Sequence, residues 1–120
     1  MLWSITTGTA GASELVREEG RIPKLTAQNL VNLLIEEKVL PEGVRVRNFQ
    51  VAQKLISLDL TGEMEEAAGK LGTSGEYILM GSLVNTFLSN YDAEQLELTI
   101  EGRKLATGHE IYDEPLGFYE

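Results

Sequence analysis

The stretch GKLGTSGEYILMGSLVNTF, residues 69–87, joins three glycines to a long apolar segment. Large apolar residues within this stretch and directly after it recur at the spacing of one helix face. They are Leu79, Leu83, Val84, Phe87 and Leu88. This spacing predicts a helix over residues 74–89, and Thr73 with Glu76 fits the T-x-x-E pattern of a capping box at its start. The glycines could instead form a phosphate-binding loop, because such loops also lead into a helix.

The spacing of the glycines argues against a phosphate site. A P-loop requires G-x-x-x-x-G-K-[ST], in which the lysine reaches the phosphates. Here the spacing is G-x-x-G-x-x-G, and Lys70 lies early in the loop. Glu76 would place a carboxylate in the first helical turn, where it would repel a phosphate. We therefore interpret the segment as a loop followed by a capped helix.

Residues 26–38, TAQNLVNLLIEEK, predict a second helix. Thr26 is its expected N-cap, and Lys38 lies in its last turn, where a cation suits the helix dipole. Five apolar residues recur at helical spacing. They are Ala27, Leu30, Val31, Leu34 and Ile35. A helix with one apolar face needs a sheet to pack on, because its own ordering costs about as much as its burial contributes.

Alternating apolar and polar residues predict strands on both sides of the helices. The expected strands are residues 2–6, 13–23 (the weakest), 44–51, 54–60, 95–100 and 103–106. A short Ala52-Gln53 link suggests one hairpin, and Glu101-Gly102 forms the turn of another. Residues 61–72 are interpreted as a loop, with one helical turn as an option. This order favours an α+β fold, a mixed or antiparallel sheet with two helices packed on one face, in a single domain over residues 1–120.

Composition restricts the classes of partner. The chain has 19 acidic and 10 basic residues and a net charge of −9, which disfavours nucleic acid and anionic membrane surfaces. No segment approaches the roughly 18–20 unbroken apolar residues of a membrane span, so we expect any membrane anchor to lie outside this segment. The segment has no cysteine, which excludes disulfides, thiolate chemistry and cysteine-based metal sites within it.

The candidate chemical groups give no recognisable catalytic set, and we expect no catalytic residue, cofactor or metal. His109 is a single histidine, which builds no usual zinc site without cysteine unless carboxylates complete it. A group of carboxylates could serve glycoside hydrolysis or bind calcium, but its spacing does not match D-x-[DN]-x-[DN]-G. These carboxylates are Asp59, Glu63, Glu65 and Glu66. We interpret them as solvated loop charge.

Two further features leave alternatives open. Asn85 and Thr86 stand in mid-helix although both are mediocre helix formers, so they either cap a neighbouring strand or loop or face water. The C-terminal EPLGFYE places Leu116, Phe118 and Tyr119 within four residues. Such a segment either docks on its own domain or contacts a partner.

Taken in order, the segments resemble the GerM family, in particular its GerMN (sporulation and spore germination) domain. The similar segments are AQNLVNLLIEEKVLPEGVRVRNF, ISLDLTGEM, GTSGEYILMGSLVNTF and LELTIEGRKLATGHEIYDEPLGFYE. The residues that match are Leu58, Asp59, Leu60, Thr61, Glu76, Val84, Asn85, Thr86 and Gly102. Met64 stands where the family has an aromatic residue. We expect Asp59, Thr73, Glu76, Asn85, Thr86 and Gly102 to serve the architecture.

The resemblance implies a non-catalytic, extracytoplasmic module of a Firmicutes-type bacterial envelope protein, held by a lipid or membrane anchor and similar in fold to ring-building motifs. Its implied partners are other envelope or sporulation proteins, or copies of itself. A module that binds peptidoglycan or another cell-wall glycan is one alternative, although three Phe, four Tyr and one Trp provide no evident stacking row. A wall-directed hydrolase using Asp59 is the other.

Overall fold

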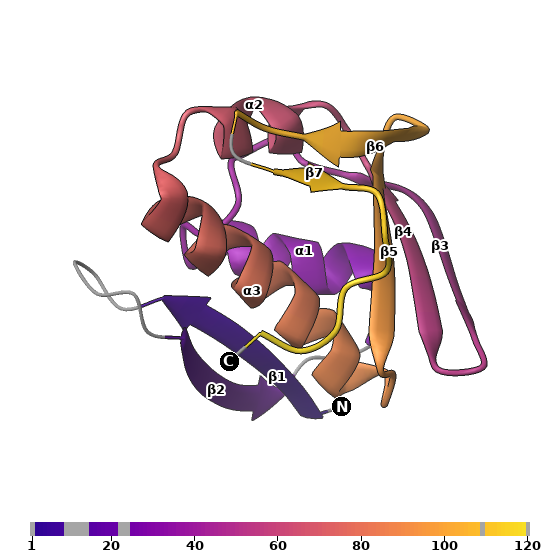
Figure 1. Ribbon diagram of the computed structural model, residues 1–120. Coiled ribbons are helices and arrows are strands. Elements are labelled where there is room, and N and C mark those ends of the chain that lie inside the picture. The colour runs from indigo at the N-terminus through magenta and orange to yellow at the C-terminus, as the bar shows by residue number, and fades with distance from the viewer. Residues whose placement is uncertain (1, 9–14, 22–24, 109, 120) are drawn as a thin grey trace.

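The computed structural model describes residues 2–8, 15–21, 25–108 and 110–119, the first two segments by their backbone alone (Figure 1). Their elements, in chain order, are β1 (Leu2–Gly8), β2 (Leu15–Arg21), α1 (Ala27–Glu36), β3 (Val46–Ala52), β4 (Leu55–Leu60), α2 (Glu63–Gly69), α3 (Thr73–Asn90), β5 (Gln95–Ile100), β6 (Arg103–Ala106) and β7 (Ile111–Tyr112). The predictions for the side chains of the first strand and for His109 concern parts of the chain outside the description.

The strands form two sheets. β1 and β2 pair antiparallel as a separate hairpin, and the five-stranded sheet has the order β3-β4-β5-β6-β7. Within this larger sheet β4 and β5 run parallel, with Leu58 opposite Leu98, whereas the other pairs are antiparallel. Parallel neighbours need a long crossover connection, and here α2 and α3 supply it. The predicted α+β fold with a mixed sheet is confirmed.

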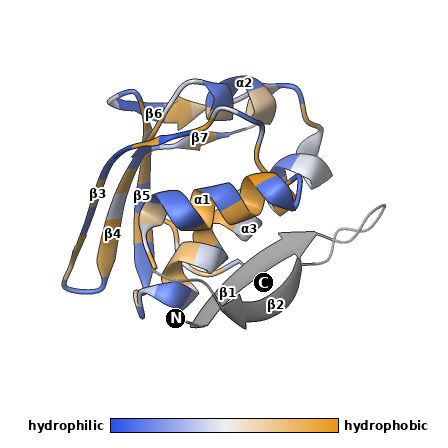
Figure 2. Cartoon of the chain, turned by 180° about the vertical axis from the view of Figure 1, so that it is seen from behind, coloured by the Kyte–Doolittle hydropathy of each residue, from blue (hydrophilic) through white to orange (hydrophobic). Residues whose placement is uncertain are grey.

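The core lies between the five-stranded sheet and two helices. α1 and α3 lie on the same side of the sheet, as predicted, and Figure 2 shows hydrophobic and hydrophilic residues alternating along α1. The inward residues of the two parallel strands are buried. They are Ile56, Leu58, Leu60, Leu96, Leu98 and Ile100. Each buried aliphatic side chain contributes about 1.5–3 kcal/mol before the cost of ordering.

Helix α3 is covered on several sides. It contacts β1 of the N-terminal hairpin as well as α1 and β5 (Figure 1). Every residue from 79 to 88 is buried, including the polar Ser82, Asn85 and Thr86. A helix buried all round carries apolar residues beyond one face, which explains why this segment has such a dense apolar sequence. Within the described chain, none of the helices combines the length and apolarity needed to cross a bilayer.

Helix α2 occupies the segment interpreted as a loop, and its seven residues exceed the single helical turn that the sequence left as an option. Met64 and Ala68, four residues apart, are both buried, whereas Glu65 and Glu66 between them are not. The carboxylates of its first turn suit the positive end of the helix dipole. The two apolar positions are too few to produce a clear helical pattern in sequence, and burial against the rest of the domain forms this short helix.

The ends of the long helices differ from prediction in two places. Thr26 caps α1 as expected, since its Oγ1 accepts a hydrogen bond of 3.0 Å from the Asn29 backbone N–H. The predicted capping box of α3 is absent, because Gly72 is the N-cap and makes no side-chain cap bond, and Thr73 is already helical. The carboxylate of Glu76 is turned instead toward Tyr112.

Lys38 does not lie in the last turn of α1, which ends at Glu36. Lys38 has a φ of 62°, in the left-handed region, and its N–H donates to the Ile35 carbonyl at 3.0 Å. The Val39 N–H donates to the Leu34 carbonyl at 2.9 Å. These two bonds form a Schellman motif, which usually places glycine at the position that Lys38 occupies.

The β3–β4 and β5–β6 turns of the larger sheet share one geometry. Gln53 and Lys54, rather than Ala52 and Gln53, form the β3–β4 turn, with φ values of 52° and 67°. Glu101 and Gly102 form the β5–β6 turn as predicted, with φ values of 50° and 83°. Positive φ at both central residues is the type I′ turn that matches the twist of paired strands.

Candidate functional site

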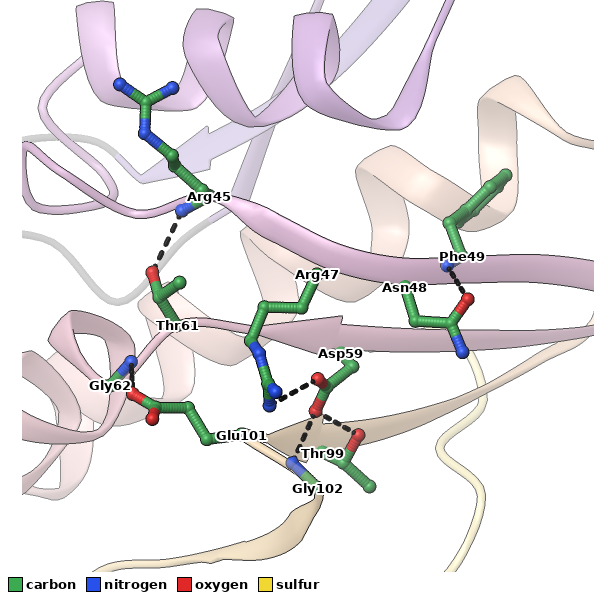
Figure 3. A network of polar contacts seen from close by, with 10 residues as sticks. All are labelled: Arg45, Arg47, Asn48, Phe49, Asp59, Thr61, Gly62, Thr99, Glu101 and Gly102. Atoms are coloured by element: carbon green, nitrogen blue, oxygen red, sulfur yellow. Dashed lines mark hydrogen bonds and ion pairs between the residues drawn. The ribbon is translucent and has the colours of Figure 1, made fainter.

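Asp59 on β4 is the centre of a polar network at one end of the sheet (Figure 3). Its Oδ1 accepts hydrogen bonds from Thr99 Oγ1 at 2.6 Å and from the Gly102 backbone N–H at 2.9 Å. Its Oδ2 lies 3.0 Å from the Arg47 guanidinium on β3. The carboxylate therefore joins three neighbouring strands and fixes the β5–β6 turn.

The chemistry of Asp59 suits this structural use. Burial alone would raise the pKa of its carboxyl, but the hydrogen bonds from Thr99 and Gly102 and the charge of Arg47 outweigh burial and lower that pKa. A carboxylate with a lowered pKa is a weak base and rarely carries the proton that a general acid needs. The arrangement accordingly favours holding strands together over proton transfer.

The same end of the sheet is fastened to the start of α2. Glu101 Oε2 accepts a hydrogen bond of 2.7 Å from the Gly62 backbone N–H, and Thr61 Oγ1 accepts one of 3.0 Å from the Arg45 N–H (Figure 3). A Cβ on Gly62 would lie 2.7 Å from the same Glu101 oxygen. Glycine at this position therefore lets the backbone approach the carboxylate closely.

The other candidate carboxylates do not join Asp59. Glu63, Glu65 and Glu66 lie in the first turn of α2, and Glu65 lies 3.8 Å from Arg103. Within the described part of the chain, no three residues of the metal-binding types are grouped so that they could hold an ion.

The C-terminal segment is attached to the domain by backbone and side-chain bonds. Leu116 forms an isolated antiparallel bridge with Leu96 through bonds of 2.8 and 2.9 Å. Asn85 in α3 binds both backbone groups of Tyr119: its Oδ1 accepts from the N–H at 2.8 Å, and its Nδ2 donates to the carbonyl at 2.9 Å. Leu116 and Tyr119 pack against the core, whereas the Phe118 side chain is 54% exposed.

A cleft of about 430 Å³ lies between the first turns of α3, strand β7 and the C-terminal segment. Its lining residues are Thr73, Glu76, Tyr77, Glu110, Ile111, Tyr112, Asp113, Glu114, Pro115, Leu116 and Tyr119. Glu76 is 3% exposed, and its Oε2 accepts a hydrogen bond of 2.5 Å from the Tyr112 hydroxyl. This volume is within the range of about 300–1,000 Å³ typical of ligand sites.

Burial and nearby carboxylates together set the electrostatics of the cleft. Burial, followed by the hydrogen bond to Glu76, raises the pKa of the Tyr112 hydroxyl. Burial also raises the pKa of Tyr119 to about 12, with further contributions from the charges of Glu76 and Glu110 and from Tyr77. Both hydroxyls thus remain protonated near neutral pH and keep their ability to donate hydrogen bonds.

The structure brings together some of the sequence candidates and separates others. Thr73, Glu76, Leu116 and Tyr119 all line the cleft, while Asn85 fastens the segment that forms one wall. Gly102 belongs to the Asp59 network, and Thr86 is fully buried in α3.

Sequence reasoning named none of the other seven lining residues as candidates. They are Tyr77, Glu110, Ile111, Tyr112, Asp113, Glu114 and Pro115. The signal that could have found them is the mixture of apolar, aromatic and acidic residues in EIYDE, residues 110–114, which is unusual for a plain solvated loop.

Fold and site together define a small α+β module with an acidic cleft beside its C-terminal segment. A model of the Germane family, described as sporulation and spore germination, matches residues 6–106, and the chain belongs to this family. The resemblance to the GerM family and its GerMN domain is thereby confirmed.

Solved structures show the same fold at low sequence identity. The first GerMN domain of the sporulation protein GerM from Bacillus subtilis has a TM-score of 0.75 and 17% identity, covering 98% of this chain and 97% of that one. The tandem GerMN domains of the same protein give a TM-score of 0.65 and 14% identity, and the match covers 99% of this chain and 44% of the tandem chain. A protein of Clostridium perfringens described as a lipoprotein has a TM-score of 0.58 and 14% identity, and the match covers 98% of this chain and 87% of that one. No curated protein matches the chain significantly.

Proposed function

We propose that this chain is a non-catalytic, extracytoplasmic module of a bacterial envelope protein that acts by assembling with other proteins. Its family, sporulation and spore germination, supports the biological setting. Likeness to a protein described as a lipoprotein supports an extracytoplasmic place with an anchor outside residues 1–120.

The observation that carries the assembly proposal is the pair of exposed apolar side chains on the C-terminal part of the chain. Ile111 is 61% exposed and Phe118 is 54% exposed. In contrast, the polar residues Asp59 and Asn85 are committed to bonds inside the domain. Ile111 lines the cleft, and exposed apolar surface at a groove is typical of sites that contact a partner.

Binding of cell-wall glycan is the second candidate function, and the three tyrosines of the cleft are the observation that favours it. Aromatic rings can pack against sugars, and hydroxyl and carboxylate groups can bind their hydroxyls. A sedimentation assay with purified peptidoglycan separates this function from protein assembly.

The compartment can be tested directly because the chain has no cysteine. A cysteine replacing exposed Glu37 would be the only thiol within residues 1–120, and the full-length protein without this substitution is the control for any thiol outside them. In intact cells of the source bacterium, we expect a membrane-impermeant maleimide to label this thiol in the full-length protein. Labelling only after lysis would contradict an extracytoplasmic location.

The assembly role can be tested by photo-crosslinking in the same cells. A photoreactive phenylalanine analogue at Phe118 should form covalent adducts with another envelope protein. The same analogue at Glu36, which is exposed and does not line the cleft, is the control. Equal, diffuse crosslinking from both positions would contradict a specific protein contact at the C-terminal segment.

A further inference from the structure

The cleft beside the C-terminal segment has a one-sided charge. Four of its lining residues are acidic and, among its described lining residues, none is lysine or arginine. The acidic ones are Glu76, Glu110, Asp113 and Glu114. The last three are exposed at the rim, while Glu76 is buried at the α3 wall. A concave surface lined by one sign of charge focuses the field and attracts ligands of the opposite sign.

Aromatic rings complement this charge. Tyr77 and Tyr119 both line the cleft, with ring centroids 5.5 Å apart and planes tilted by 55°. A cation beside tyrosine rings is attracted by the ring electrons, and arginine adds stacking of its planar guanidinium group. Burial is the main cause that raises the pKa of Tyr119, and the charges of Glu76 and Glu110 add to it. These negative charges would stabilise such a cation.

Apolar surface at the rim points to a polypeptide and not to a bare ion. Ile111 lines the cleft and is 61% exposed. The carboxylates of the cleft are not grouped as metal ligands in the described structure. A ligand that satisfies both kinds of surface carries cationic side chains together with apolar ones.

We propose that this cleft binds a basic, partly apolar segment of a partner protein, with a Lys or Arg side chain between the tyrosines and the carboxylates and an apolar residue against Ile111. The inference rests on the proposed function, of which it defines the partner chemistry. A second copy of this chain is a poor occupant, because its 19 acidic residues outnumber its 10 basic ones.

The test compares two variants of the chain that lose equal charge. The cleft variant combines Glu110→Gln, Asp113→Asn and Glu114→Gln, and the control combines Glu36→Gln, Glu37→Gln and Glu42→Gln. All six residues are exposed, and none of the control residues lines the cleft. The probe is a short fluorescein-labelled peptide that alternates Arg and Lys with Leu, and fluorescence anisotropy measures its dissociation constant at ~0.15 M salt.

We expect the cleft variant to bind the peptide roughly tenfold more weakly, which corresponds to about 1.4 kcal/mol, while the control keeps the affinity of the unmodified chain. Tyr77→Leu, which removes the aromatic ring but keeps apolar volume, should also weaken binding. A matched peptide with citrulline and acetyl-lysine should bind poorly. Equal losses in the two charge variants would mean general charge attraction and would overturn the proposal.

Three further outcomes distinguish a failure of this inference from a failure of the proposed function. If a glucosamine oligosaccharide binds the cleft and the peptide does not, the occupant is an amino glycan and the proposal is overturned. If the peptide fails to bind while crosslinking at Phe118 persists in cells, the inference fails and the proposed function stands. If cleft-dependent peptide binding holds while Phe118 forms no specific adduct, the proposed assembly at that segment fails and the cleft chemistry stands.

Discussion

Asp59 shows how a single charged residue can replace apolar packing at the end of a sheet. Its side chain is 14% exposed, so an unpaired carboxylate there would lose much of its hydration. Donors from β3, β5 and the β5–β6 turn replace that hydration at distances of 2.6–3.0 Å. Hydrogen bonds to a charged group contribute more than neutral ones, so the strands are held together by the ionised form of this residue.

Replacing Asp59 with asparagine should lower the free energy of unfolding by about 1–2 kcal/mol at pH 7. Asparagine keeps the shape but loses the ion pair with Arg47 and one charged acceptor. Because the folded-state pKa of Asp59 is lowered, its stabilisation is complete above the unfolded pKa of about 3.9 and is lost as pH falls through the folded pKa. Urea titrations at pH 7 and below pH ~3 should therefore show that the unfolding free energies of the unmodified chain and the variant differ less at the acidic pH. A difference independent of pH would contradict this role.

Ser82 offers the opposite case, a polar atom that the fold does not use. It is fully buried in α3, and its Oγ has no hydrogen-bond partner in the described structure. Ser82→Ala should raise the free energy of unfolding by about 1 kcal/mol, because a buried unsatisfied hydroxyl is removed and alanine is the better helix former. The comparison is Thr86→Ala, which removes a packed methyl group and a hydroxyl at another fully buried site and should lower stability. Thermal unfolding of both variants checks the two signs.

Elements were predictable from sequence where local chemistry decides them. Thr26 and the apolar face of α1 gave that helix its start and its packing side, and the strands β4 and β5 followed from strict alternation. Sequence rules for helix ends and turns failed at positions of positive φ, where glycine or asparagine is usual but this chain has another residue. Lys38 and the Gln53-Lys54 turn adopt left-handed backbone without the sequence signal for it, because hydrogen bonds on either side stabilise them.

The candidate site was less predictable because its residues are distant in sequence. Tyr112 and Glu76 are separated by 36 positions, and Asn85 and Tyr119 by 34. A polar residue in mid-helix signals only that some partner exists, and the tertiary fold decides which one. Glu76 illustrates this limit: its position suits a capping box, yet a nearby tyrosine hydroxyl in the folded chain forms its bond instead.

The end of α1 gives a prediction at the scale of one element. Lys38→Gly should raise the free energy of unfolding by about 0.5–1 kcal/mol, because glycine adopts a φ of 62° without the steric cost that a Cβ imposes. Lys38→Ala retains the Cβ and serves as the control for loss of the charged side chain. Urea denaturation should show the gain for glycine alone. A gain of the same size for alanine would attribute the effect to charge rather than to backbone conformation.

At the scale of the whole molecule, the C-terminal segment packs against the core and is bonded to both the sheet and α3. After β7 the chain passes beside β5 and α3 (Figure 1), where Leu116 forms a bridge with Leu96 of β5 and Tyr119 is bonded to Asn85 of α3. This route places Phe118 on the surface while its neighbour Tyr119 is held against the domain. The docked residues of the segment pack against the core, and its outward residue is the one through which we propose contact with a partner.

Asn85→Asp should release this segment while leaving the rest of the domain folded. The carboxylate cannot donate to the Tyr119 carbonyl, so at pH 7 an acceptor faces an acceptor where a 2.9 Å hydrogen bond existed. We expect the docked state to lose about 1–2 kcal/mol, which increases the opened population of the segment roughly 5- to 30-fold. Chymotrypsin cleavage after Phe118, followed by mass spectrometry, measures that population when opening is fast relative to cleavage. Cleavage at Phe87, which is fully buried in α3, reports global unfolding and should change much less. Parallel increases at both sites would show that the C-terminal segment unfolds only with the whole domain.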